Sequence, residues 1–259
     1  MKVTAHDPVG ATVEEIELAK VGGTEAAEIA ALLAEHGVLA FPGQELDDEA
    51  FVGFLRAFGP LAFTKGEAHA PGAPDLNVVS NVGRTTPPKS NFHVDTSYVR
   101  EPPAYTALRA VEIPDEGGET IFSNQYRAYD TLFEGIRENL EGRSINHVVT
   151  GVELEEGDEH EARHLIFRPH PTTGKVALYM TTPARCAAID GMDEYATRET
   201  VEMLFEHSTQ EENCHRHSWA PGDVVMWDNA CVLHKADHSG VVGDRVMHRG
   251  MVAAYPSPS

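Results

Sequence analysis

The chain has 259 residues, of which 41% are hydrophobic and 24% charged, a composition typical of a soluble globular protein with a large buried core. Its formal net charge of −21 at pH 7 repels phosphate backbones and anionic lipid, so we expect neither a nucleic-acid nor a membrane partner. An anionic small molecule would need a local cationic pocket, which makes individual arginines worth following along the chain.

The N-terminal part of the chain predicts two helices with a strand between them. A helix is expected over 24–36, where Thr24 can serve as N-cap and Gly37 as the C-terminal stop. The short apolar run 38–41 predicts a strand. A second, amphipathic helix is expected over 47–58, because its phenylalanines and leucine recur on one face.

The next segment, 65–90, is rich in glycine, proline and small residues, and it contains one strand candidate at 76–79. The rest predicts a long loop, and long loops in compact domains often act as lids. No linker or internal repeat divides the chain. We therefore expect a single domain, 1–259, with an active-site lid near 62–90.

The middle of the chain predicts strands at 92–98, 105–112 and 120–123, followed by a helix at 125–132. The acidic stretch 153–163 is typical of a solvated surface.

The last part of the chain is mostly strand. Two apolar runs flank a turn and predict a hairpin. The predicted elements are the hairpin strands 165–168 and 176–179, a helix at 194–207, and strands at 214–219, 223–227 and 245–254. Early helices and many later strands favour a β-sandwich or barrel-like pair of sheets braced by helices.

Cysteine usage points to a reducing compartment. Cys186, Cys214 and Cys231 form neither a CxxC motif nor an even disulfide framework. The N-terminal residues lack an apolar signal core, and no apolar run is long enough to span a bilayer. We therefore expect a cytoplasmic protein.

The tripeptide His93-Val94-Asp95 is the first candidate metal motif. Side chains alternate faces along a strand, so His93 and Asp95 are expected to offer one nitrogen and one oxygen to the same ion. His234 follows a predicted strand at the start of a loop and is the candidate third ligand. Two imidazoles and a carboxylate suit Fe(II) with an open coordination face, and zinc is chemically possible as well.

The other histidines are weaker candidates for the third ligand, because they lie in polar surroundings or border the acidic stretch. They include His147, His160, His164, His215, His217 and His238.

Further motifs stand in a characteristic order around these residues. They are 37–44 (GVLAFPGQ), 58–61 (FGPL), 101–103 (EPP), 117–120 (GGET), 168–174 (RPHPTTG), 227–229 (WDN) and 245–249 (RVMHR). Together with the histidines and Asp95, this order resembles the taurine dioxygenase (TauD/TfdA) family of Fe(II)- and 2-oxoglutarate-dependent dioxygenases over nearly the whole chain. The resemblance implies a mainly β fold, a double-stranded β-helix or jelly-roll core flanked by helices.

The resemblance also implies roles for five residues. His93, Asp95 and His234 would bind Fe(II), and Thr120 and Arg245 would bind the distal carboxylate of 2-oxoglutarate. A guanidinium fork and a hydroxyl suit that carboxylate. The implied reaction consumes O2 and 2-oxoglutarate, releases succinate and CO2, and oxidises a small molecule, with hydroxylation as the expected outcome.

Arg249 is the main clue to the substrate. It lies four residues after Arg245 and so on the same strand face. In relatives that use sulfonates and aryloxyacetates, an arginine at this position contacts the substrate's acid group, so the resemblance implies an anionic substrate. Lys89, Asn91 and Tyr98 are further candidates for the pocket. Ala184 stands where taurine enzymes carry an aromatic residue, which argues against taurine itself.

Two other functions stay open on the residues alone. A zinc-dependent hydrolase could use the same three ligands with a bound water. A non-catalytic jelly-roll binding protein could carry incidental histidines. Members of the resembled family are often dimers or tetramers, which implies a homo-oligomer.

Overall fold

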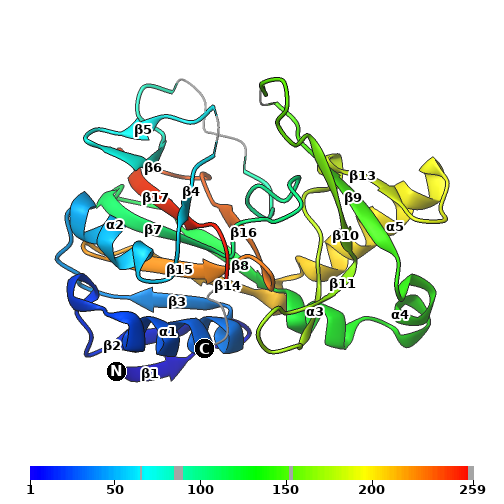
Figure 1. The fold of residues 1–259 in the computed structure, drawn as a ribbon, viewed down its shortest axis with the longest axis horizontal. Coiled ribbons are helices and arrows are strands. Elements are labelled where there is room, and N and C mark those ends of the chain that lie inside the picture. The colour runs from blue at the N-terminus through cyan, green and yellow to red at the C-terminus, as the bar shows by residue number, and fades with distance from the viewer. Residues whose placement is uncertain (65, 85–89, 152–153, 256–259) are drawn as a thin grey trace.

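The computed structural model describes residues 1–64, 66–84, 90–151 and 154–255 (Figure 1). Its largest feature is a nine-stranded sheet in the order β1-β2-β3-β15-β7-β17-β6-β5, with β4 also paired to β17. These strands are β1 (Lys2–Ala5), β2 (Ala11–Glu14), β3 (Val38–Phe41), β4 (Leu61–Ala62), β5 (His69–Ala70), β6 (Ala73–Ser80), β7 (Tyr105–Glu112), β15 (Val224–Asp228) and β17 (Val246–Val252).

A second, three-stranded sheet packs against the first. Its order is β14-β8-β16, formed by β14 (Cys214–His217), β8 (Thr120–Asn124) and β16 (Val232–Ala236). Phe122 and Val232 of this sheet share a buried apolar cluster with Trp227 and Leu108 of the large sheet. The core is therefore a sandwich of two sheets, as the sequence predicted.

The remaining strands form a separate part of the fold, at the right of Figure 1. β10 (Glu161–Leu165), β9 (Ser144–Val148) and β13 (Cys186–Ile189) form one sheet, and β11 (Phe167–Pro169) pairs with β12 (Val176–Leu178). The antiparallel pairing of Phe167 with Leu178 confirms the predicted hairpin.

Helices brace these sheets. They are α1 (Gly23–His36), α2 (Asp48–Arg56), α3 (Gln125–Thr131), α4 (Glu134–Leu140) and α5 (Glu194–Ser208), with short 3-10 turns η1 (Leu18–Lys20), η2 (Pro183–Arg185) and η3 (Glu211–Asn213). Helix α2 begins where the Asp47 carboxylate accepts the backbone N–H of Ala50 at 2.8 Å. Its apolar face, Phe51, Phe54 and Leu55, is buried, as expected from the sequence. No helix among the described residues is long and apolar enough to cross a membrane.

The strand predicted at 76–79 within the 65–90 segment is confirmed but longer than expected. Strand β6 has eight residues, because it pairs along β17 and so gains partners that local composition cannot reveal. Two other predictions around the site were wrong in conformation. The strand over 92–98 is absent: His93 forms an isolated bridge with His234, and Thr96 has φ of 49° in a turn. His234 lies inside β16, not at the start of a loop.

The described part of the acidic stretch 153–163 lies at the surface as predicted, apart from Ala162. Its end belongs to β10, along which Ala162 and His164 are buried while Glu161, Arg163 and Leu165 are exposed.

Candidate active site

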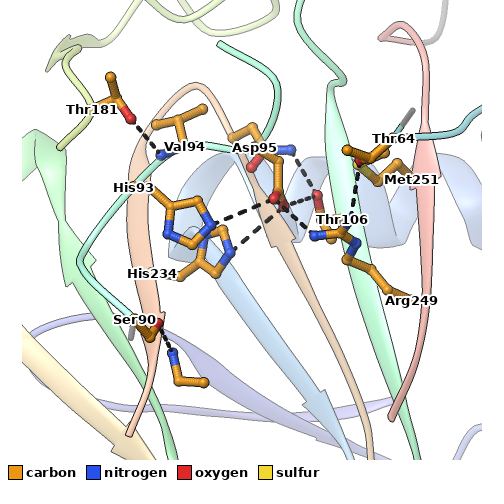
Figure 2. A network of polar contacts seen from close by, with 12 residues as sticks. Thr64, Ser90, His93, Val94, Asp95, Thr106, Thr181, His234, Arg249 and Met251 are labelled. Carbon is orange, nitrogen blue, oxygen red and sulfur yellow. Dashed lines mark hydrogen bonds and ion pairs between the residues drawn. The ribbon is translucent and has the colours of Figure 1, made fainter. Parts of the chain in front are cut away.

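His93, Asp95 and His234 meet at one point of the structure (Figure 2). One ligand atom from each residue lies within 4.8 Å of the other two. The Nε2 atoms of His93 and His234 stand 3.7 and 3.6 Å from the two oxygens of the Asp95 carboxylate. Among the described residues, this is the one group of three or more His, Cys, Asp and Glu side chains arranged to hold a metal ion.

Backbone pairing brings the two histidines together. The N–H groups of His93 and His234 each donate to the other residue's carbonyl, at 3.0 and 3.1 Å. His93 Nδ1 lies 2.8 Å from the backbone oxygen of Asn91, so the hydrogen sits on Nδ1 and Nε2 keeps its lone pair for a metal. Burial, and then the neighbouring His93, lowers the pKa of His234 to about 3, which keeps that imidazole neutral.

Asp95 is fixed from two sides. Thr106 Oγ1 donates to Asp95 Oδ2 at 2.8 Å, and Arg249 Nη1 donates to Asp95 Oδ1 at 3.2 Å. Burial on its own would raise the pKa of the Asp95 carboxyl. Interaction with His234, and then the charge of Arg249 and the hydrogen bond from Thr106, outweigh burial and hold that pKa below its usual range, so the carboxylate is ionised and available to a cation.

Arg245 is a buried cation with one donor unused. It is 1% exposed, its Nε donates to the carbonyl of Gly118 at 2.9 Å, and its Nη2 lies 3.4 Å from Thr120 Oγ1. Its Nη1 is buried and has no hydrogen-bond partner among the described residues. Burial lowers the pKa of Arg245 to about 10, so it keeps its charge at neutral pH and needs an anion.

Thr120 and Gly118 complete this corner. Thr120 Oγ1 accepts the indole N–H of Trp219 at 3.1 Å as well as the Arg245 contact, which leaves its own O–H available to donate. Gly118 has φ of 81°, and a Cβ there would lie 3.1 Å from Arg245 Cδ. Gly118 of the 117–120 motif thus makes room for the arginine.

Arg249 differs from Arg245 because it already has carboxylate partners, although its Nε is also buried without a hydrogen-bond partner among the described residues. Besides Asp95, its Nη2 lies 2.5 Å from Glu67 Oε2, 3.0 Å from Thr64 Oγ1 and 3.4 Å from Asn77 Oδ1. Both arginines are buried, with Arg249 8% exposed; Arg249 lies in β17 and Arg245 just before it.

The other predicted pocket residues differ in their exposure to solvent. Asn91 is exposed and serves His93 through its backbone oxygen, while Tyr98 is buried in the turn after Asp95. Lys89 lies outside the described residues. Ala184 is exposed in η2.

Sequence reasoning missed three side chains that contact this site. Asn229, in the 227–229 motif, donates to Thr106 Oγ1 at 3.0 Å and so supports the partner of Asp95. The motif could have pointed to Asn229, and the inward face of β7 to Thr106. Glu67 carries no signal in the sequence, since it is one acidic residue in a glycine- and proline-rich segment.

Comparison with known proteins identifies the family. The sequence model described as "Taurine catabolism dioxygenase TauD, TfdA family" matches residues 2–251. The chain belongs to the TauD/TfdA family. It is 32% identical to the alpha-ketoglutarate-dependent 2,4-dichlorophenoxyacetate dioxygenase of Cupriavidus pinatubonensis, over 94% of each chain.

Solved structures agree with this assignment. A taurine dioxygenase from Burkholderia xenovorans superimposes with a TM-score of 0.85 at 30% identity, over 98% of this chain and 90% of that one. AAD-2 in complex with Mn(II) and N-oxalylglycine superimposes with a TM-score of 0.84 at 25% identity, over 98% of each chain. The core is therefore the jelly-roll of this family, as predicted.

The family membership decides between the functions left open by the sequence. The protein is a dioxygenase that uses Fe(II), 2-oxoglutarate and O2 and acts on a small molecule. Neither the zinc hydrolase nor the non-catalytic binding protein receives support from these relatives.

Proposed function

We propose that the protein hydroxylates a small acid-bearing molecule, with release of succinate and CO2. Two features of the structure carry the proposal together. Three candidate metal-ligand side chains face one another, and the buried Arg245 has a donor without a hydrogen-bond partner among the described residues. A 2-oxoglutarate molecule has the groups to satisfy both, since one end chelates a metal and the other is a carboxylate.

In this proposal His93, Asp95 and His234 are the iron ligands. Two neutral imidazole nitrogens and one ionised carboxylate form the donor set that suits Fe(II) and leave the opposite face open. When bound, iron and 2-oxoglutarate together supply the activation of O2. Asp95 fills the position that a halogenating site leaves to halide, which favours hydroxylation.

Arg245 and Thr120 bind the distal carboxylate of 2-oxoglutarate. The unused Nη1 of Arg245 and the O–H of Thr120 are two donors at the same place. A carboxylate there would give the desolvated guanidinium the anion it lacks.

The substrate is proposed to be a small acid. Arg249 is the cationic group beside Asp95, and relatives include enzymes named for 2,4-dichlorophenoxyacetate and for sulfonates. Asn91, Tyr98 and Lys89 remain proposed pocket residues. The lid near 62–90 also remains a proposal, supported by the contacts of Thr64 and Glu67 with Arg249.

We further propose a single domain over 1–259, a homo-oligomer, and a cytoplasmic location. The location is supported by the three cysteines, all of which are free thiols.

Turnover with matched compounds tests the reaction. Purified enzyme with Fe(II) and 2-oxoglutarate should release succinate in air, and aryloxyacetates or sulfonates should accelerate this more than their uncharged amides do. His93→Ala should abolish the release. Succinate release that survives His93→Ala, or none in the wild type with any small acid, would contradict the proposal.

A further inference from the structure

Glu67 reaches into the candidate active site and contacts the arginine that we expect to hold the substrate. Its carboxylate lies 2.5 Å from Arg249 Nη2. We propose that Glu67 selects the substrate by charge: it neutralises Arg249 in the free enzyme, and only an acid group that displaces it can bind there. This inference rests on the proposed function and adds a specificity-determining residue to it.

The two carboxylates on Arg249 differ in whether they can leave. Asp95 holds Nη1, and its side chain is 5% exposed. It is also a proposed iron ligand, so it stays in place when the enzyme is loaded. The Glu67 side chain, which pairs with Nη2, is 38% exposed. Glu67 is therefore the exchangeable partner.

The local backbone lets Glu67 move without unfolding its segment. The residue lies between β4, which pairs with Met251 and Val252 of β17, and β5, which pairs with β6. Both ends of the connection are thus tied to the sheet. A rotation of the Glu67 side chain into water is enough to vacate Arg249 Nη2.

Charge makes the exchange selective. The Arg249 side chain is 9% exposed, so it needs an anionic partner whether or not a substrate is present. A substrate acid and the Glu67 carboxylate repel each other at this short range, so one replaces the other. A neutral compound gains nothing by displacing Glu67, because it would break the Glu67 ion pair without replacing it and leave Arg249 with Asp95 as its one carboxylate partner.

The energetic consequence is a lower affinity for acids that make few other contacts with the enzyme. Binding of an acid must first break the Glu67–Arg249 pair, so its affinity is lower than the arginine alone would give. Acids that make further contacts overcome the penalty, and small abundant anions do not. Removing the Glu67 charge should therefore relax discrimination among acids and leave neutral ligands unaffected.

The test uses three probes that share one ring and differ in charge: phenoxyacetate, phenoxyacetamide and 2-phenoxyethylamine. Their Kd values are measured by calorimetry on enzyme loaded with Fe(II) and 2-oxoglutarate without O2. For Glu67→Gln we expect phenoxyacetate to bind about tenfold more tightly than to the wild type, with phenoxyacetamide unchanged within about twofold. Glu67→Asp, which keeps the charge but shortens the side chain, should give an intermediate value.

A matched control separates the local effect from net charge. Glu28 is exposed on α1, so Glu28→Gln removes the same charge without touching Arg249 and should leave all three Kd values unchanged. The proposal is overturned if phenoxyacetate binds Glu67→Gln no better than the wild type, including binding to neither. It is also overturned if the amine binds the wild type best and loses affinity in Glu67→Gln.

Failure of this inference can be told apart from failure of the proposed function. If Fe(II) and 2-oxoglutarate bind and succinate forms while Glu67→Gln leaves phenoxyacetate binding unchanged, only the role of Glu67 is wrong. If neither loading nor succinate release is seen, the proposed function itself fails.

Discussion

Two pairs of neighbouring histidines lie in different surroundings within the protein. The rings of His93 and His234 are 4.3 Å apart, and those of His147 and His164 are 5.1 Å apart. The first pair turns its Nε2 atoms toward Asp95. In the second pair, His147 stacks on the ring of Tyr179 at 5.6 Å, and both of its nitrogens lack hydrogen-bond partners among the described residues.

The comparison shows which feature distinguishes a histidine pair suited to bind a metal from one that only packs. Proximity is common to both pairs, and His234, His147 and His164 are buried, whereas the His93 side chain is 28% exposed. Only the first has an ionised carboxylate between its nitrogens, itself held by Thr106 and Arg249. His164 instead places Nε2 2.8 Å from the carbonyl of Ser97 and so supports the turn that follows Asp95. We therefore propose metal binding for the first pair and packing for the second.

The largest expected effect is a loss of Fe(II) affinity when a histidine of the first pair is replaced, with no loss when one of the second pair is replaced. His93→Ala removes one of three ligands and should weaken Fe(II) binding by at least about 100-fold. His147→Phe keeps an aromatic ring against Tyr179 and should leave it unchanged. Anaerobic competition with a chelator measures both. Equal losses in the two variants would erase the distinction between the pairs.

A second prediction extends the comparison to the cosubstrate. Arg245→Met removes the buried cation but keeps an apolar side chain, and should raise the Kd of 2-oxoglutarate about 100-fold by loss of a charge-assisted contact. Calorimetry on the Fe(II) enzyme without O2 provides the measurement. Arg216→Met, which removes an exposed arginine paired with Asp237, is the control and should change nothing. An unchanged Kd for Arg245→Met would show that Arg245 does not bind 2-oxoglutarate.

The His147–His164 pair should make the free energy of unfolding depend on pH. Burial, and then the charge of His164, lowers the pKa of His147 to about 3, while an unfolded histidine titrates near 6.5. Below about pH 6.5 the unfolded chain takes up a proton that folded His147 refuses, so stability falls as pH drops toward 3.

This loss should amount to about 2 kcal/mol between pH 7 and pH 5, and His147→Phe should remove it. Urea unfolding of both proteins at the two pH values measures the difference. Parallel pH dependence in the wild type and His147→Phe would mean that His147 is not the buried neutral group.

The smallest effect concerns the support of the metal carboxylate. Thr106→Val keeps the shape of the side chain but removes the hydrogen bond to Asp95 Oδ2, and should weaken Fe(II) binding about tenfold. Thr200→Val, on α5, is the matched control. A Thr106→Val enzyme with wild-type metal affinity would show that Asp95 needs no such support.

The sequence predicted which residues form the site better than how the chain presents them. His93, Asp95 and His234 were found from the order of motifs, and their side chains do meet, while Arg245 lies beside Thr120. The strand geometry invoked for His93 and Asp95 was wrong, because the chain leaves the sheet after His93 and turns at Thr96. Side-chain alternation along a strand predicted that His93 and Asp95 lie together, but a turn and not a strand holds them there.

Long-range pairing explains what could not be predicted. Strand β6 extends over eight residues because β17 supplies its hydrogen-bond partners, whereas the local sequence predicted a strand at 76–79 only. The contact of Glu67 with Arg249 joins residues far apart in the chain, and no local pattern encodes it. The core elements α1, β3 and β7 were predictable because their apolar periodicity is local.

The central claim, that one histidine pair and one arginine hold iron and 2-oxoglutarate, has one direct test. Fe(II) and 2-oxoglutarate are added to the enzyme without O2, and the visible spectrum is examined for a weak metal-to-ligand charge-transfer band. We predict the band in the wild type and in His147→Phe, its absence in His93→Ala, and a higher 2-oxoglutarate requirement in Arg245→Met. No band in the wild type, or a band that persists in His93→Ala, would contradict the account.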